Sequence, residues 1–280
     1  VGHNDLLTES GEKLLAAEGE KMPASDTDDE QAGCGSFADS WDVYPRPQMK
    51  RDKYMILKDG WTLDGKPIRM PFPPQSMLSG FEGKVGDEIT YETTFSIPED
   101  FTKERVLLNF GAVDQIAEVW IDGKHAGSHE GGYLPFALDI TELVRGAVHK
   151  LTVKVTDKLD KKYPYGKQTK KRGGMWYTPV SGIWQTVWME PVADAHVTSY
   201  FAVSDIDAKK LNVEVEAELQ EGDICKVVLL DEGNVVAEAE GTEVSLDVPE
   251  MKLWSPDSPV LYDLEISIVR GGETVDAVKG

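Results

Sequence analysis

Side chains capable of acid–base or metal chemistry are numerous in this chain, but their spacing does not predict a reaction centre. Glu214, Glu216 and Glu218 alternate with apolar residues, and a period of two places such a stripe on the solvent side of a strand. His125 and His129 stand four apart, a spacing that can bind zinc from a helix. Because they follow an Asp-Gly turn and have a glycine between them, we expect structural or exposed histidines. We therefore predict no catalytic residue and no metal site.

Other classes of function are disfavoured by composition. The formal net charge of −21 argues against nucleic acid as a partner, because phosphates attract clusters of Lys and Arg. No run of about 18 apolar residues is present, so we expect no membrane span. A glycine-rich phosphate loop, a nucleophile elbow and Cys/His metal spacing are also missing from the sequence.

The charge is distributed unevenly and predicts three units. Residues 1–44 carry 11 acidic and 2 basic side chains, residues 45–191 carry 19 and 21, and residues 192–280 carry 20 and 6. The first unit lacks apolar anchors, so we expect it to be largely disordered, with at most a short helix over residues 7–19. Pro45 and Pro47 mark the first boundary.

Beyond residue 45 the dominant hydrophobic period is two, which predicts strands. An Asp-Gly pair at 122–123 predicts a hairpin, and about seven short strands within the last 90 residues are typical of a sandwich. The sequence therefore predicts an all-β chain of two β-sandwiches. The clearest expected strands are 89–97, 106–110, 117–121, 151–155, 183–189, 211–219, 227–230, 235–239, 244–248 and 262–268.

Only two cysteines occur, Cys34 and Cys225, and their settings differ too much to predict a disulfide. We expect two free thiols. The first residues have no basic region followed by an apolar stretch, so no secretory signal is predicted. The expected location is cytoplasmic.

Several motifs in a fixed order carry a family resemblance that spans residues 45–279. The chain closely resembles the sugar-binding jelly-roll domain and the following immunoglobulin-like domain of glycoside hydrolase family 2, the β-galactosidase, β-glucuronidase and β-mannosidase group. The motifs are FGAVD at 110–114, EVWIDGK at 118–124, GSHEGGYLPF at 127–136, DIT at 139–141, GGMWYTPVSGIW at 173–184 and LWSP at 253–256.

Much of this motif content has a structural explanation. Gly131 and Gly132 supply backbone freedom, and we expect the side chains of Tyr133 and Phe136 to fill the core. The resemblance implies a jelly-roll domain over residues 45–191 and an immunoglobulin-like sandwich over residues 192–280.

The resemblance also implies where catalysis would take place. In that family a (β/α)₈ barrel follows these two domains and carries both catalytic glutamates, and such a barrel needs about 250 residues. We therefore expect this chain by itself to be inactive, as the amino-terminal part of an enzyme that hydrolyses terminal β-linked sugars with retention. That chemistry requires no cofactor, although some members of the family use Mg²⁺ or Na⁺.

Three residues are candidate sugar contacts through the resemblance. Asp157 is similar to an aspartate that some β-galactosidases use against sugar hydroxyls, and a carboxylate can accept two hydrogen bonds from neighbouring hydroxyls. Trp176 and Tyr177 lie near the place where some members put a substrate-facing side chain. Residues 158–172 carry seven basic side chains among fifteen. This segment is interpreted as a solvated loop, as a loop that docks on an acidic barrel rim, or as one that favours an anionic sugar.

The expected partners are a carbohydrate and a catalytic barrel, in the same polypeptide or in another. Two alternatives remain at this stage. One is a stand-alone carbohydrate-binding module, and the other is an architectural module that mediates homo-oligomer contacts.

Overall fold

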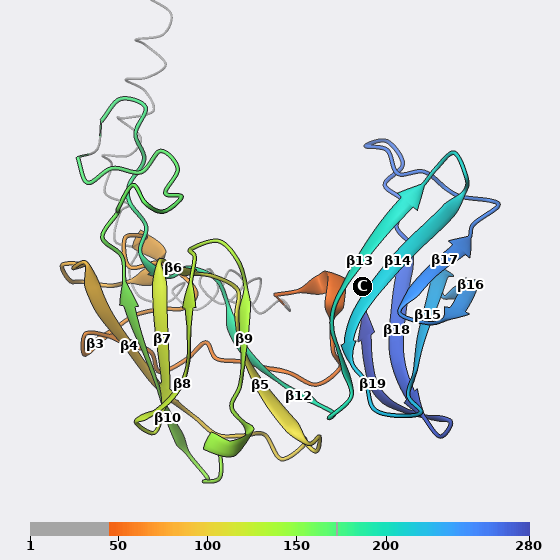
Figure 1. Ribbon diagram of the computed structural model, residues 1–280. Coiled ribbons are helices and arrows are strands. Elements are labelled where there is room, and N and C mark those ends of the chain that lie inside the picture. Colours follow the sequence, from red (N-terminus) through yellow and green to blue (C-terminus); the bar gives the residue numbers. More distant parts are fainter. Residues whose placement is uncertain (1–44, 172) are drawn as a thin grey trace, which may run out of the picture. The chain divides into compact units, whose positions relative to one another are not determined.

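The computed structural model describes residues 45–171 and 173–280. Residues 1–44, with the helix expected over 7–19 and the thiol of Cys34, lie outside the described residues. The described chain forms antiparallel sheets that build two sandwiches in succession (Figure 1). This confirms the all-β class and the two-sandwich prediction.

The first sandwich packs a six-stranded sheet against a four-stranded one. The larger sheet runs β3 (Lys66–Pro67), β2 (Thr62–Leu63), β4 (Glu88–Phe95), β10 (His149–Thr156), β7 (Ile116–Ile121) and β8 (Lys124–Glu130). The smaller runs β1 (Met55–Ile56), β12 (Val187–Val192), β5 (Arg105–Phe110) and β9 (Phe136–Asp139). A separate two-stranded pair joins β6 (Val113–Asp114) to β11 (Gly182–Ile183). Three short 3₁₀ helices are also described: η1 (Pro47–Met49), η2 (Met77–Ser79) and η3 (Thr141–Leu143).

Strand alternation explains this core. Tyr91, Val119 and Val153 of the larger sheet join Leu108 and Met189 of the smaller one in a single buried cluster. On strands of period two, these residues fall on one face while their neighbours fall on the other. The Asp-Gly hairpin is confirmed between β7 and β8, because both of its residues adopt positive φ, 50° at position 122 and 78° at position 123.

The second sandwich packs a three-stranded sheet against a four-stranded one. The first sheet runs β13 (His196–Asp205), β14 (Lys210–Glu218) and β17 (Glu243–Asp247). The second runs β16 (Asn234–Glu240), β15 (Ile224–Asp231), β18 (Asp263–Arg270) and β19 (Glu273–Lys279). Val213 and Val215 point into the core, whereas Glu214, Glu216 and Glu218 are exposed, as expected.

One predicted strand is wrong as a single element. The expected strand 183–189 is divided into β11 and β12, with residues 184–186 between them. Ile183 pairs with Val113 and Val187 pairs with Phe110, so the chain changes partner strands at the break. The backbone NH of Gly111 donates to the carbonyl of Thr186 inside this break, at 2.9 Å.

The two cores do not follow chain order. Met49 precedes the first sandwich in sequence but belongs to the buried cluster of the second, with Val197, Val227 and Ile266. The domain boundaries at 44/45 and 191/192 stay a prediction.

Candidate functional site

One end of the first sandwich gathers the polar loops. Thr156, the last residue of β10, lies opposite Glu88 on one side and Ile116 on the other, and Ile116 in turn lies opposite Glu130. The loops that follow β10 and β8, and those that precede β4 and β7, therefore lie at the same end of the sheet. The long loop of residues 157–181 leaves this end of the sheet and is green in Figure 1.

Asp157 is the best-positioned of the three sequence candidates. Its Oδ1 accepts a hydrogen bond from the backbone NH of Leu159 at 2.9 Å, and its Oδ2 accepts one from Ser181 Oγ at 2.8 Å. Its own backbone NH donates to the carbonyl of Asp87 at 2.8 Å. Each carboxylate oxygen has two lone pairs, so the side chain is held in place and keeps acceptor capacity for a hydroxyl.

Trp176 and Tyr177 lie in the same loop and expose 49% and 65% of their surface. The Tyr177 NH donates to the Lys167 carbonyl at 2.9 Å, and its carbonyl accepts from Thr169 at 3.2 Å, so the loop folds back on itself. Within the described residues, no hydrogen bond or ring contact joins either aromatic ring to Asp157. The loop thus carries all three candidates, and the folded-back backbone presents the two aromatic rings to solvent.

Asp114 is a site residue that the sequence did not identify. It is 6% exposed, and its strand partner is Gly182, the residue after Ser181. Burial, and secondarily the negative charge of Asp157, raise the pKa of Asp114 to about 6. The sequence signals were its place at the end of the FGAVD motif and between the expected strands 106–110 and 117–121.

Gly132 explains how the Asp114 carboxyl is accommodated. A Cβ added at this glycine would overlap the carboxyl group of Asp114. The glycine was singled out for backbone freedom, but its tertiary role is to leave room for a side chain 18 positions away.

Two glutamines that the sequence did not identify also hold the loop. Gln75 accepts from the backbone NH of Ser181 at 3.2 Å, and Gln168 accepts from the backbone NH of Val180 at 2.5 Å. Amide side chains in loops carry no periodic signal, so only the tertiary contacts identify them.

The basic segment is solvated as far as the structure describes it. All six of its described lysines are exposed, and Lys170 pairs with Asp87 at 2.8 Å. The hydrogen bond from Lys170, together with the positive charges of Lys170 and Lys158, lowers the pKa of Asp87.

The expectation for Tyr133 is wrong, while that for Phe136 is confirmed. Tyr133 is 48% exposed and meets Trp184 edge-on at 6.4 Å, because it lies in the connection between β8 and β9 rather than on a strand. Phe136 stacks on Phe110 at 4.7 Å and packs against the first core. The exposed ring of Tyr133 therefore adds an aromatic side chain to this part of the molecule.

The histidine expectation is confirmed. His125 and His129 lie on strand β8, where His125 is exposed and His129 stacks on Phe136 at 4.3 Å. Among the described residues, no group of three or more His, Cys, Asp or Glu side chains is arranged to hold a metal ion. In this part of the chain, no helix has the length and apolarity to cross a membrane.

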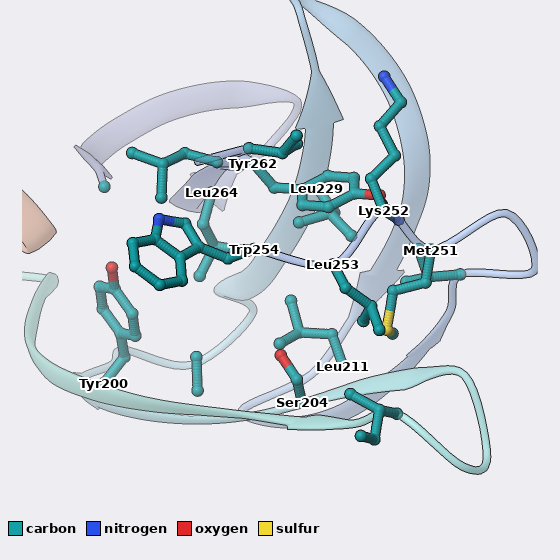
Figure 2. Close-up of a pocket in the computed structure, with 16 residues that line it drawn as sticks. Tyr200, Ser204, Leu211, Leu229, Met251, Lys252, Leu253, Trp254, Tyr262 and Leu264 are labelled. Carbon is teal, nitrogen blue, oxygen red and sulfur yellow. Dashed lines mark hydrogen bonds between the residues drawn. The ribbon is translucent and has the colours of Figure 1, made fainter. Parts of the chain in front are cut away.

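The second sandwich carries a different kind of candidate, an apolar hollow of about 550 Å³. Its lining includes Tyr200, Leu211, Met251, Trp254 and Leu264, and Figure 2 shows the Trp254 ring within it. Pockets of this size and character bind ligands in many proteins, but no charged pair suited to catalysis lines it.

Two family models match consecutive segments of this chain. The model described as "Glycosyl hydrolase 2 galactose-binding domain-like" matches residues 82–185, and "Glycosyl hydrolases family 2" matches residues 183–280. The first covers the end of the jelly roll that carries Asp114 and Asp157, and the second covers the second sandwich.

Relatives of known activity are longer than this chain. A β-glucuronidase of Paenibacillus borealis is 27% identical in an alignment of 224 residues that covers 72% of this chain and 37% of that protein. A β-galactosidase of Thermoanaerobacter pseudethanolicus is 26% identical in an alignment of 208 residues that covers 66% of this chain and 26% of that protein. The chain thus spans well under half of these curated relatives.

A solved structure shows the same fold. The β-glucuronidase of Ruminococcus gnavus matches with a TM-score of 0.69 at 24% identity, covering 85% of this chain and 46% of that chain. The fold is thus a galactose-binding-like jelly roll followed by an immunoglobulin-like sandwich. The chain belongs to glycosyl hydrolase family 2, whose N-terminal region it represents.

Proposed function

We propose that this chain is the non-catalytic part of a family 2 β-glycosidase that hydrolyses terminal β-linked sugars. Its role is to help shape the sugar site through the loop end of the first sandwich. The observation that carries the proposal is Asp157, held by Ser181 and Leu159 with lone pairs to spare. The catalytic acids belong to a barrel, joined in the same polypeptide or associating from another.

Carboxylate chemistry in this chain supports the non-catalytic role. Glycosidases need two carboxyl groups that face each other across the scissile bond. The negative charge of Asp157 contributes to the raised pKa of Asp114, but Asp114 is buried against Gly132, and Asp157 is bonded to the backbone and to Ser181. Asp114 is 6% exposed and has no open side for a water or a sugar carbon, so it cannot serve as the second carboxyl opposite Asp157.

The exposed lysines of residues 158–171 and the aromatic rings at 176 and 177 extend this proposal. They would meet the sugar or the acidic rim of a barrel, and homo-oligomer contacts through the jelly roll are part of the same proposal. A cytoplasmic location is part of the same proposal, and the free, buried thiol of Cys225 is compatible with it.

The test measures sugar turnover and sugar binding by the chain. A panel of nitrophenyl β-glycosides should show no turnover, and any hydrolysis by the purified chain would contradict the non-catalytic role. Binding of methyl β-glycosides, followed by NMR, should perturb the loop 157–181. Asp157→Ala should weaken that binding at least tenfold.

Asp160→Ala is the matched control. Asp160 lies in the same loop and accepts from the backbone NH of Lys162 at 3.0 Å, so it reports on loop order without touching the proposed sugar contact. Equal losses in the two variants would argue for a general loop effect. Unweakened binding in Asp157→Ala would contradict the assigned contact. Sequencing the gene beyond codon 280 then separates a fused barrel from a stand-alone module.

A further inference from the structure

The segment just before the first sandwich is attached to the second one. The backbone NH of Lys50 donates to the Lys279 carbonyl at 2.7 Å, and the NH of Lys279 donates back at 2.9 Å. Met49 is 5% exposed within the second core, and the Tyr200 hydroxyl donates to the Gln48 carbonyl. A few residues later the chain enters β1, which pairs with β12 of the first sandwich. This segment therefore contacts the second sandwich directly, although it precedes the first sandwich in sequence.

Arg51 lies at the centre of this connection and is 4% exposed. Its guanidinium donates to both carboxylate oxygens of Asp276 on β19, at 3.2 and 2.9 Å. It also donates to the carbonyl of Val197 on β13 at 2.6 Å and to Glu190 on β12 at 3.3 Å. One side chain thus contacts three strands that belong to two sandwiches.

The acceptors of Arg51 are held by further bonds. Glu190 is fully buried and accepts from the Trp188 indole NH at 2.7 Å and from Arg46 at 3.1 Å. Asp276 also accepts from the backbone NH of Val197 at 2.9 Å. The strand β12 places Val187 and Met189 in the first core, and Trp188 and Glu190 on its opposite, also buried face.

Burial makes this network decisive for stability. Removing one member of a buried, hydrogen-bonded ion network leaves an uncompensated charge, and such changes are strongly destabilising. A second ion pair also joins the two sandwiches, Arg105 with Glu218 at 2.9 Å, but its side chains are 32% and 50% exposed. Solvent screening makes pairs of that kind weak.

We propose that residues 46–51 form a strap, with Arg51 as its lock, that couples the two sandwiches into one cooperative folding unit. The proposal does not depend on the sugar chemistry described above. It predicts that neither sandwich opens at equilibrium while the other stays folded.

The experiment follows each sandwich with its own probe during urea unfolding of the whole chain. In a Cys34→Ser background, Cys225 is the sole thiol, and it is 3% exposed in the second core. Five of the seven tryptophans lie in residues 45–191, and Trp254 in the second sandwich is already 59% exposed. Tryptophan fluorescence therefore reports mainly the first sandwich, and thiol reactivity reports the second. In the Cys34→Ser parent we expect coincident transitions.

Arg51→Met should separate the probes. We expect the Cys225 thiol to become reactive at a lower urea concentration than the one that changes tryptophan fluorescence, and Tm to fall by roughly 6–20 °C. Arg105→Met is the matched control, since it removes a partly exposed arginine that pairs across the same two sandwiches. It should keep the probes coincident and change Tm by less than about 3 °C.

Two further variants cover the case in which Arg51→Met does not fold. Arg51→Lys keeps a charge but loses the planar, multidentate donor, and Asp276→Asn removes one acceptor charge. Both should produce the same separation of probes in a milder form. Coincident probes and an unchanged Tm in Arg51→Met would overturn the proposal. So would two separate transitions in the parent, or coincident probes in both milder variants after Arg51→Met fails to fold.

Discussion

The two sandwiches share an architecture but differ in which side chains lie in an unfavourable environment. The first has a nearly neutral sequence and keeps a buried acid, Asp114, at its polar end. The second is strongly acidic and gathers exposed apolar side chains around one hollow, with Leu253, Trp254 and Leu261 exposed by 59%, 59% and 78%. Neither feature is needed to close a sandwich.

This difference indicates where each sandwich contains residues that stability of the fold does not require. Residues that break a local packing or charge rule mark places where function is expected. In the first sandwich the exception is electrostatic and lies among loops, whereas in the second it is hydrophobic and lies on a face. Four measurements test the contrast.

The largest effect should come from the second core itself. Ile266 is fully buried in β18, and Ile266→Ala should destabilise the chain by about 2–5 kcal/mol. Leu261→Ala, at the exposed hollow, should change stability by about 0.5 kcal/mol or less. Equilibrium urea unfolding measures both, and equal losses would remove the distinction between core and hollow.

A slightly smaller effect is expected beside the polar end of the first sandwich. Gly182 has φ +79°, and an added Cβ would overlap the buried Tyr91 ring. Gly182→Ala should destabilise by roughly 2–4 kcal/mol, since strain and overpacking combine. Gly233→Ala in the second sandwich has the same φ but open space, so urea unfolding should show a loss of only about 1 kcal/mol. Similar losses of stability in the two variants would show that overlap with Tyr91 adds no cost at Gly182.

Asp114 should oppose folding at neutral pH. Its folded pKa of about 6 lies above the unfolded value near 3.9, so the folded state binds more protons between these values. Stability therefore falls as pH rises from about 4 to about 6. Asp114→Asn should add roughly 1–3 kcal/mol at pH 7.5 and little at pH 4. A gain independent of pH in urea unfolding would exclude the carboxyl charge as the cause.

The smallest stability effect is expected at the apolar hollow. The double variant Leu253→Lys with Leu261→Lys should stay within about 0.5 kcal/mol of the parent, because both side chains are exposed. It should nevertheless reduce the fluorescence of the apolar dye ANS bound to the native chain. Unchanged dye fluorescence would mean that the hollow is not an accessible apolar surface.

Local pattern was sufficient for much of this protein. Alternation in residues 211–219 identified β14 with its inward valines and outward glutamates, because side-chain direction on a strand depends only on position parity. The Asp-Gly pair identified the hairpin between β7 and β8, because that turn requires positive φ at adjacent residues. The ordered motifs identified the family and pointed to Asp157.

Contacts between distant segments decided the rest. The break at residues 184–186, the burial of Asp114 beside Gly182 and the exposure of Tyr133 all depend on which strands pair. Arg51 meets Asp276 across 225 residues of sequence. A hydrophobic period records only which side of its own strand a residue faces. The partner on that side is supplied by the folded chain.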